Sequence, residues 1–148
     1  MSRCFRHDKL GHGEMKGLVA LAATLAGWAH AVVAEESMDG AALYQQNCAS
    51  CHGAELQGQP DWRSPGPEGR LPAPPHDATG HTWHHGDDIL FRITREGTAA
   101  VVGGGYESDM PGFGDSLSDA EIRAILDYIK STWPERERIY QRERTRQE

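Results

Sequence analysis

The amino-acid sequence predicts an all-α fold, a small domain built from three or more helices. Helical signals mark three segments, residues 38–51, 86–96 and 118–133. No strand pattern, in which apolar and polar residues alternate, surrounds the cysteine pair of the first segment. A domain of this length buries a limited core, so we expect a bound group or a covalent link to help hold the helices together.

The first 34 residues have the three-part pattern of a secretory signal peptide. Lys16 precedes a short apolar run, and small residues follow, with cleavage expected after Ala31 or Ala34. The run is short for a membrane-spanning helix, and an uncleaved anchor is the alternative. Residues 1–14 have no periodic pattern, so Met15 is a second candidate for the true start. These features predict export to the periplasm and a mature chain that begins at Glu35.

The predicted mature chain is strongly acidic. Residues 1–34 carry four of the 15 Lys and Arg residues and two of the 22 Asp and Glu residues, which leaves a formal charge of −9 on residues 35–148. An acidic surface argues against DNA, other nucleic acids and anionic membranes as partners. It favours a protein partner with a basic docking face. Membrane association is expected only through an uncleaved N-terminal anchor.

The first predicted helix covers residues 38–51 and contains the cysteine pair. Ser37 is its expected N-cap, because a serine hydroxyl can accept from the free N–H groups of the first turn. Gly40 would allow a second helix to cross closely, since glycine has no Cβ. A long loop rich in proline and glycine follows over residues 57–80, and loops of this length in a small domain are usually functional or disordered.

The middle helix is expected over residues 86–96. Asp87 and Asp88 lie in its first turn, where the helix dipole favours negative charge. Gly97 is expected to end it, because glycine readily adopts the conformation that terminates helices.

The helix over residues 118–133 has the clearest pattern. Ser118 and Glu121 match a capping box at its start, and Pro134 marks its end. An apolar stripe at helical spacing is expected to face the core, and its members are Ile122, Ile125, Leu126 and Ile129. The charged residues 134–148 then form a solvated, partly helical tail, which we expect to be a frayed end.

Residues 48–52 read Cys-Ala-Ser-Cys-His, the attachment motif of c-type haem. Two thiols three positions apart lie on one side of a helical turn, where both can form thioethers to the vinyl groups of a porphyrin. The adjacent His52 can then ligate the iron. A structural zinc site would need a second pair of ligands, a thioredoxin-like pair would need a βαβ setting, and a plain disulfide would not explain His52.

The second axial ligand follows by elimination among the methionines. Met1 and Met15 fall in the signal segment, and Met38 precedes Cys48 on the same predicted helix, so it cannot easily reach across the ring. Met110 remains, in a glycine-rich polar loop and directly before a proline. Methionine sulfur opposite histidine is a standard axial pair of cytochromes c and raises the reduction potential. Bis-His ligation through His76 is the alternative.

With these residues in place, the sequence over residues 38–133 resembles the class I mono-haem cytochrome c family. The order of "NCASCH", "MPGF" and a final amphipathic helix carries the resemblance. It implies a small α-helical fold wrapped round one haem c, covalently bound through Cys48 and Cys51, with His52 and Met110 as iron ligands. It implies one-electron transfer rather than enzymatic activity. It also implies a hydrogen bond from the proximal imidazole to a carbonyl near Pro60 or within Pro72–Pro75.

The predicted function is that of a periplasmic c-type cytochrome that carries single electrons between redox partners. One alternative is a haem enzyme or gas sensor with a labile sixth ligand. Another is a metal-binding protein that uses the histidine cluster, which is His76, His81, His84 and His85. The haem propionates are expected to find donors among Arg and Trp side chains, with the candidates Trp62, Arg63, Arg70 and Trp83.

Overall fold

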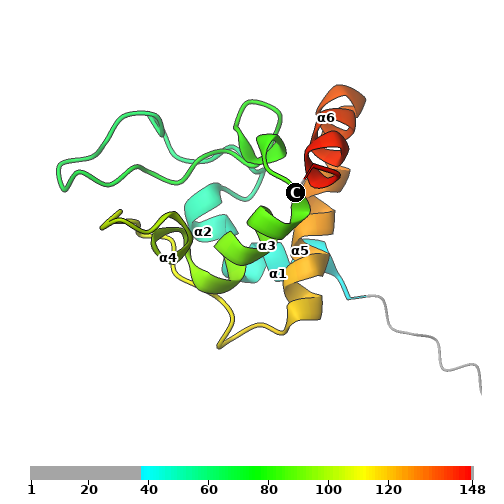
Figure 1. Ribbon diagram of the computed structural model, residues 1–148, viewed down its shortest axis with the longest axis horizontal. Coiled ribbons are helices and arrows are strands. Elements are labelled where there is room, and N and C mark those ends of the chain that lie inside the picture. Colours follow the sequence, from blue (N-terminus) through cyan, green and yellow to red (C-terminus); the bar gives the residue numbers. More distant parts are fainter. Residues whose placement is uncertain (1–37, 148) are drawn as a thin grey trace, which may run out of the picture. The chain divides into compact units, whose positions relative to one another are not determined.

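A computed structural model describes residues 38–147, and within this range the chain is helical and has no strand (Figure 1). The elements are α1 (Gly40–Asn47), α2 (Ala49–His52), the 3-10 turn η1 (Thr82–His84), α3 (Asp87–Glu96), α4 (Thr98–Val102), α5 (Asp119–Ser131) and α6 (Glu135–Thr145). The predicted all-α fold is confirmed. The expected signal peptide and Ser37 lie outside the described residues. No described helix has the length and apolar character needed to cross a membrane.

The segment predicted as one helix over residues 38–51 forms two, α1 and α2. Asp39 caps α1, because its Oδ1 accepts from the N–H groups of Ala41 and Ala42 at 3.0 and 3.1 Å, so the prediction of Ser37 as N-cap is wrong. The two helices are separated at Cys48, where φ is −117°, and the Asn47 side chain just before it donates to the Leu43 carbonyl at 2.9 Å. Asparagine side chains compete with the backbone in this way and weaken helices.

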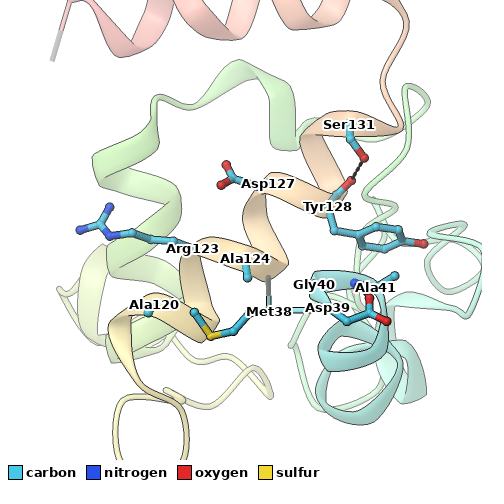
Figure 2. Close-up of a pocket in the computed structure, with 10 residues that line it drawn as sticks. All are labelled: Met38, Asp39, Gly40, Ala41, Ala120, Arg123, Ala124, Asp127, Tyr128 and Ser131. Atoms are coloured by element: carbon cyan, nitrogen blue, oxygen red, sulfur yellow. Dashed lines mark hydrogen bonds between the residues drawn. The ribbon is translucent and has the colours of Figure 1, made fainter. Parts of the chain in front are cut away.

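Helix α1 crosses α5 at Gly40, as the sequence predicts. A Cβ at this position would lie 2.1 Å from the Ala124 carbonyl oxygen, so only glycine permits the approach. Figure 2 shows Gly40 and Ala124 at the crossing, beside an open groove that Met38, Arg123 and Asp127 help to line.

The core lies between α1, α5 and the segments that cover them. Tyr44, Ile122 and Ile125 are fully buried, and the whole predicted apolar stripe of α5 belongs to the buried cluster. Ser118 caps α5 in a complete capping box with Glu121, which confirms the predicted start of this helix. Trp133, just past its end, is buried as well.

Helix α3 matches its prediction closely, since it starts after Gly86 and ends at Gly97, where φ is +91°. Lys130 of α5 pairs with Asp87 in its first turn, at 3.1 Å. Helix α4, which follows at once, was not predicted. Its five residues are too few to show a helical period, so only tertiary contact with α3 reveals it.

The charged tail is a packed helix, α6, so the expectation of a frayed end is wrong. The Gln141 side chain donates to Asp87 Oδ1 at 2.8 Å, and the Asp87 N–H donates to Thr145 Oγ1 at 3.1 Å. Tyr140 meets the Trp83 ring edge-on, with 5.3 Å between centroids. Polar groups and one aromatic ring anchor this helix, so hydrophobic periodicity could not predict its packing. Figure 1 shows α6 (red) directly following α5 (orange).

Candidate functional site

In the Cys-Ala-Ser-Cys-His motif, Cys48 is the N-cap of the short helix α2 and Cys51 lies within it. The N–H groups of Cys51 and His52 both donate to the Cys48 carbonyl, at 3.2 and 2.9 Å, so the turn is helical. Both thiols are free, Cys48 partly buried and Cys51 exposed, and the plain-disulfide interpretation does not hold. Burial, with the nearby Cys51, raises the pKa of Cys48 to about 11, so this thiol is protonated at neutral pH.

The His52 imidazole is buried, with 6 % of its surface exposed, and its orientation is fixed. Its Nδ1 lies 2.8 Å from the Pro74 carbonyl oxygen. A carbonyl can only accept, so Nδ1 carries the hydrogen and Nε2 keeps the lone pair. Burial lowers the pKa of His52, although the Pro74 bond opposes this shift. The ring is therefore a neutral imidazole whose unprotonated Nε2 has a free lone pair, the form that ligates metals.

The acceptor of this bond lies in one of the two proline regions that the sequence analysis gave as alternatives. The bond goes to Pro74, within Pro72–Pro75, and not to Pro60. The loop returns to α2 through short backbone bonds: the His76 N–H donates to the Leu56 carbonyl at 2.8 Å, and the Gln59 N–H donates to the Ala73 carbonyl at 2.9 Å. The proline-rich loop thus places a carbonyl against the motif histidine.

His76 lies on the same side as His52. The two rings stack with 3.9 Å between centroids and an angle of 22° between planes, and His76 Nδ1 lies 2.9 Å from Thr82 Oγ1. A sixth ligand must approach a flat macrocycle from the face opposite His52. A ring stacked directly on His52 is poorly placed to do so, and this arrangement favours Met110 over His76 as the sixth ligand.

Met110 lies in a separate loop, between α4 and α5. Its sulfur accepts a hydrogen bond from Thr98 Oγ1 at 3.3 Å, and its N–H donates to Ser108 Oγ at 3.2 Å. The loop is fastened beyond the methionine, where the N–H groups of Phe113 and Gly114 donate to carbonyls at the end of α3, at 2.9 and 3.0 Å. The sulfur is thus held by a single side chain on a loop anchored to α3.

Two glycines let this loop approach α3. A Cβ on Gly112 would lie 2.7 Å from the Glu96 carbonyl carbon, and one on Gly97 would lie 2.9 Å from the Gly112 nitrogen. Neither contact is tolerable between real atoms, so both positions require glycine. Gly112 of the glycine-rich loop therefore serves close backbone packing at this end of α3, whereas a Cβ on Gly103, Gly104 or Gly105 would have no neighbour within 4 Å.

Among the four candidate donors for propionates, Trp83 has a buried N–H without a hydrogen bond or ion pair in the described part of the chain. Arg70 Nε pairs with Asp109 Oδ1 at 2.7 Å, and the Arg63 guanidinium lies over the Trp62 ring at 4.1 Å. A buried N–H without an acceptor lowers the stability of the fold. Trp83 is therefore the candidate whose N–H would gain most from a propionate acceptor.

His81 and His85 meet edge-on with 5.5 Å between centroids, and the stacking partners of His81 and His84 are tryptophans. His81 stacks on Trp62 with 5.4 Å between centroids, and His84 stacks on Trp83 at 3.7 Å. Within residues 38–147 no three His, Cys, Asp or Glu side chains are grouped so that they could hold a metal ion. The hypothesis of a second metal in the cluster therefore finds no site in this part of the chain.

The chemistry of these groups fits a c-type haem. Two free thiols come from one helical turn, and a neutral imidazole with a free Nε2 follows them directly. A thioether sulfur on a glycine-rich loop and an unpartnered indole N–H complete the set. The thiols suit two vinyl groups, the imidazole and the sulfur suit iron, and the indole suits a propionate.

Comparison with known proteins supports the same assignment. The family model described as "Cytochrome c" matches residues 37–133, a range that contains the cysteine motif, Met110 and all of α5. Searches of curated proteins and of solved structures gave no significant match. Because the matched range covers most of the chain, the protein belongs to the cytochrome c family, whose members hold covalently attached haem c and transfer electrons.

Proposed function

We propose that the protein is a periplasmic electron carrier whose haem c is bound through Cys48 and Cys51 and ligated by His52 and Met110. The observation that carries the proposal is the bond between His52 Nδ1 and the Pro74 carbonyl, 2.8 Å long. It leaves Nε2 as the free nitrogen beside the two thiols. Metal-bound histidines usually have such a partner, which sets the tautomer and the ring orientation.

A haem bound in this way supplies an iron that gains and loses one electron. The residues of the chain decide how that iron is used. His52 and Met110 would together hold the iron, so that no position on it would be left for a substrate or a gas. This arrangement favours electron exchange through the edge of the ring over haem enzymology. The methionine ligand favours the reduced state, whereas the acidic chain opposes the gain of an electron.

The partners we propose are redox proteins with a basic docking face. The formal charge of −9 on residues 35–148 supports this, because opposite charges speed the encounter of electron-transfer partners. Raising the ionic strength should slow electron transfer to such a partner, since salt screens the attraction.

The proposed location rests on the apolar segment before residue 35. Expression of the full chain in a host that assembles c-type cytochromes tests it. We expect haem-stained protein in the fraction released by opening the outer membrane, with a mature mass that starts near Glu35. Haem-stained protein that stays with the membranes at full length would indicate an uncleaved anchor instead.

The absorption spectrum of the oxidised protein tests the ligand assignment. Methionine ligation gives a weak charge-transfer band at the red edge, and Met110→Ala should lose it. Met38→Ala is the matched control, because Met38 is 48 % exposed and lies before α1. Persistence of the band in Met110→Ala would refute the assignment.

Carbon monoxide distinguishes the carrier from a gas sensor or haem enzyme. The reduced wild-type protein should bind the gas slowly and weakly, because Met110 must first leave the iron. Met110→Ala should bind it rapidly. Fast and tight binding by the wild type would contradict the proposed function.

A further inference from the structure

His76 stacks on one face of the His52 ring. The ring centroids are 3.9 Å apart and the planes differ by 22°, so the two imidazoles lie nearly flat against each other. The outer edge of His76 is tied to Thr82, with 2.9 Å between Nδ1 and Oγ1. The ring of Tyr44, which is fully buried, meets His76 edge-on at 6.2 Å.

The main chain of His76 is fixed on both sides. Its N–H donates to the Leu56 carbonyl at 2.8 Å, and its carbonyl accepts from the Trp133 indole N–H at 2.6 Å. Leu56, Trp133 and Thr82 are all buried. Groups from three separate parts of the chain therefore anchor His76, and its ring cannot shift without moving the core.

The Pro74 bond alone does not define the plane of the His52 ring. One hydrogen bond restrains Nδ1 but still tolerates some rotation of the ring about the Cβ–Cγ bond, because hydrogen-bond angles are soft. A flat neighbour on the face of the ring removes this freedom, because a twist would drive the two rings into each other. His76 is the ring that the structure places there.

We propose that His76 is a positioning residue that fixes the plane of the His52 imidazole by stacking against it. The inference rests on the proposed function, in which His52 ligates the haem iron. The plane of an axial imidazole decides which iron orbitals it overlaps, and therefore how unpaired spin spreads over the ring in the oxidised state. His76 would act on the iron through His52, without touching it.

Proton NMR of the oxidised, haem-loaded protein tests this inference, because the four haem methyl resonances report that spin distribution. His76→Leu retains similar bulk but removes the flat ring, and we expect a changed order or spread of the four resonances. His76→Phe retains a flat ring without nitrogen, so it keeps the stack but loses the bond to Thr82, and we expect a smaller change than in His76→Leu. A wild-type pattern in His76→Leu, or an equal change in both variants, would overturn the inference.

Thr82→Val provides a second route if His76→Leu does not fold. It keeps the shape of the side chain but removes the partner of His76 Nδ1, so the ring gains freedom to turn. We expect the haem methyl resonances to change in the same direction as in His76→Leu. If His76→Leu does not fold, we expect the resonances of Thr82→Val to differ from those of the wild type. An unchanged methyl pattern in Thr82→Val, with His76→Leu lost, would overturn the inference.

The proposed function and the role of His76 are overturned by different results. If the wild-type protein lacks the red-edge band of His/Met ligation, the proposed function fails whatever the His76 variants do. If the band is present in the wild type and in His76→Leu, and the methyl pattern is unchanged, only the role of His76 fails.

Discussion

The two proposed iron ligands come from regions that are built differently. His52 is buried and lies between a carbonyl at 2.8 Å and a stacked ring at 3.9 Å, and both belong to a segment anchored in the core. Met110 lies on a loop whose neighbours are largely exposed, and its sulfur has one hydrogen bond, from Thr98. The histidine region is thus part of the hydrophobic core, whereas the methionine region is attached to it.

This difference predicts the order in which the two regions open when the protein is destabilised. Segments with few buried contacts open at lower free energy than the core does. The Met110 loop should therefore release the iron before the fold unfolds, while His52 should stay bound until global unfolding. The four predictions that follow test this contrast, from the largest expected effect to the smallest.

Truncation in the histidine region should cost the most. Tyr44 is fully buried, and its hydroxyl donates to the Gly53 carbonyl at 2.9 Å, at the end of α2. We expect Tyr44→Ala to lower the free energy of unfolding by about 3–5 kcal/mol, as large aromatic truncations do. Urea denaturation of the haem-loaded protein measures it. Tyr106→Ala is the control, because Tyr106 is 39 % exposed and should change stability by less than about 0.5 kcal/mol.

A steric change in the methionine region should separate ligand loss from unfolding. The Cβ of Gly112→Ala would lie 2.7 Å from backbone of α3, so we expect a loss of about 1–3 kcal/mol through overpacking. The red-edge band should disappear at a lower urea concentration than the helical signal. Gly66→Ala is the control, since its Cβ would have only an ordinary contact at 3.6 Å. Simultaneous loss of both signals in Gly112→Ala would contradict the contrast.

Lys130 ties α5 to the start of α3, the helix whose other end anchors the Met110 loop. Partial burial lowers its pKa, but Asp127 and Asp87 outweigh this and raise it above the ordinary value of 10.5. With the folded pKa raised, the stabilisation is complete below the unfolded pKa and is lost as pH rises through the folded pKa. We expect Lys130→Met to cost about 1 kcal/mol at pH 8.

Urea titrations between pH 8 and pH 11 measure the Lys130 contribution. The difference between wild type and Lys130→Met should shrink as pH rises, because the wild-type lysine loses its charge. Lys130 is the one lysine after residue 34, so no other lysine of the predicted mature chain adds to the slope. A difference that stays constant over this range would contradict the assignment.

The smallest effect is expected from the ion pair beside Met110. Asp109 is largely exposed and lies 2.7 Å from Arg70 Nε, and such pairs contribute about 0.2–1 kcal/mol. Asp109→Asn should therefore speed the displacement of Met110 by added imidazole by at most about fivefold. High salt should reduce the difference, since it screens exposed pairs. Asp115→Asn removes the same charge nearby, and an equal effect there would rule out the specific pair.

Local signals in the sequence predicted a large part of this molecule. The Cys-Ala-Ser-Cys-His motif, the capping box at Ser118 and the apolar stripe of α5 depend on residues within a few positions of one another. Their geometry follows from the helical repeat, so spacing alone was sufficient. The prediction failed at Cys48, where the backbone departs from helical geometry between α1 and α2 and no local sequence signal marks the change.

The histidine cluster shows where local signals are insufficient. Four histidines within residues 76–85 suggested a metal site or a rival iron ligand. The structure pairs His76 with His52, His81 with Trp62 and His84 with Trp83. These partners, apart from Trp83, are far along the chain, and no spacing rule specifies them.

The sequence by itself determined the chemistry of this protein, namely the two thiols, the imidazole and the thioether of a c-type haem site and the helices that carry them. Only the tertiary structure decided that Pro74 accepts from His52, that His76 stacks on His52, and that α6 packs against η1 and bonds to the first residue of α3. Covalent spacing and helical period are local properties, which a sequence displays directly. The partner of a ring or a carbonyl depends on chain reversals through the long loop, and those follow from packing of the whole domain.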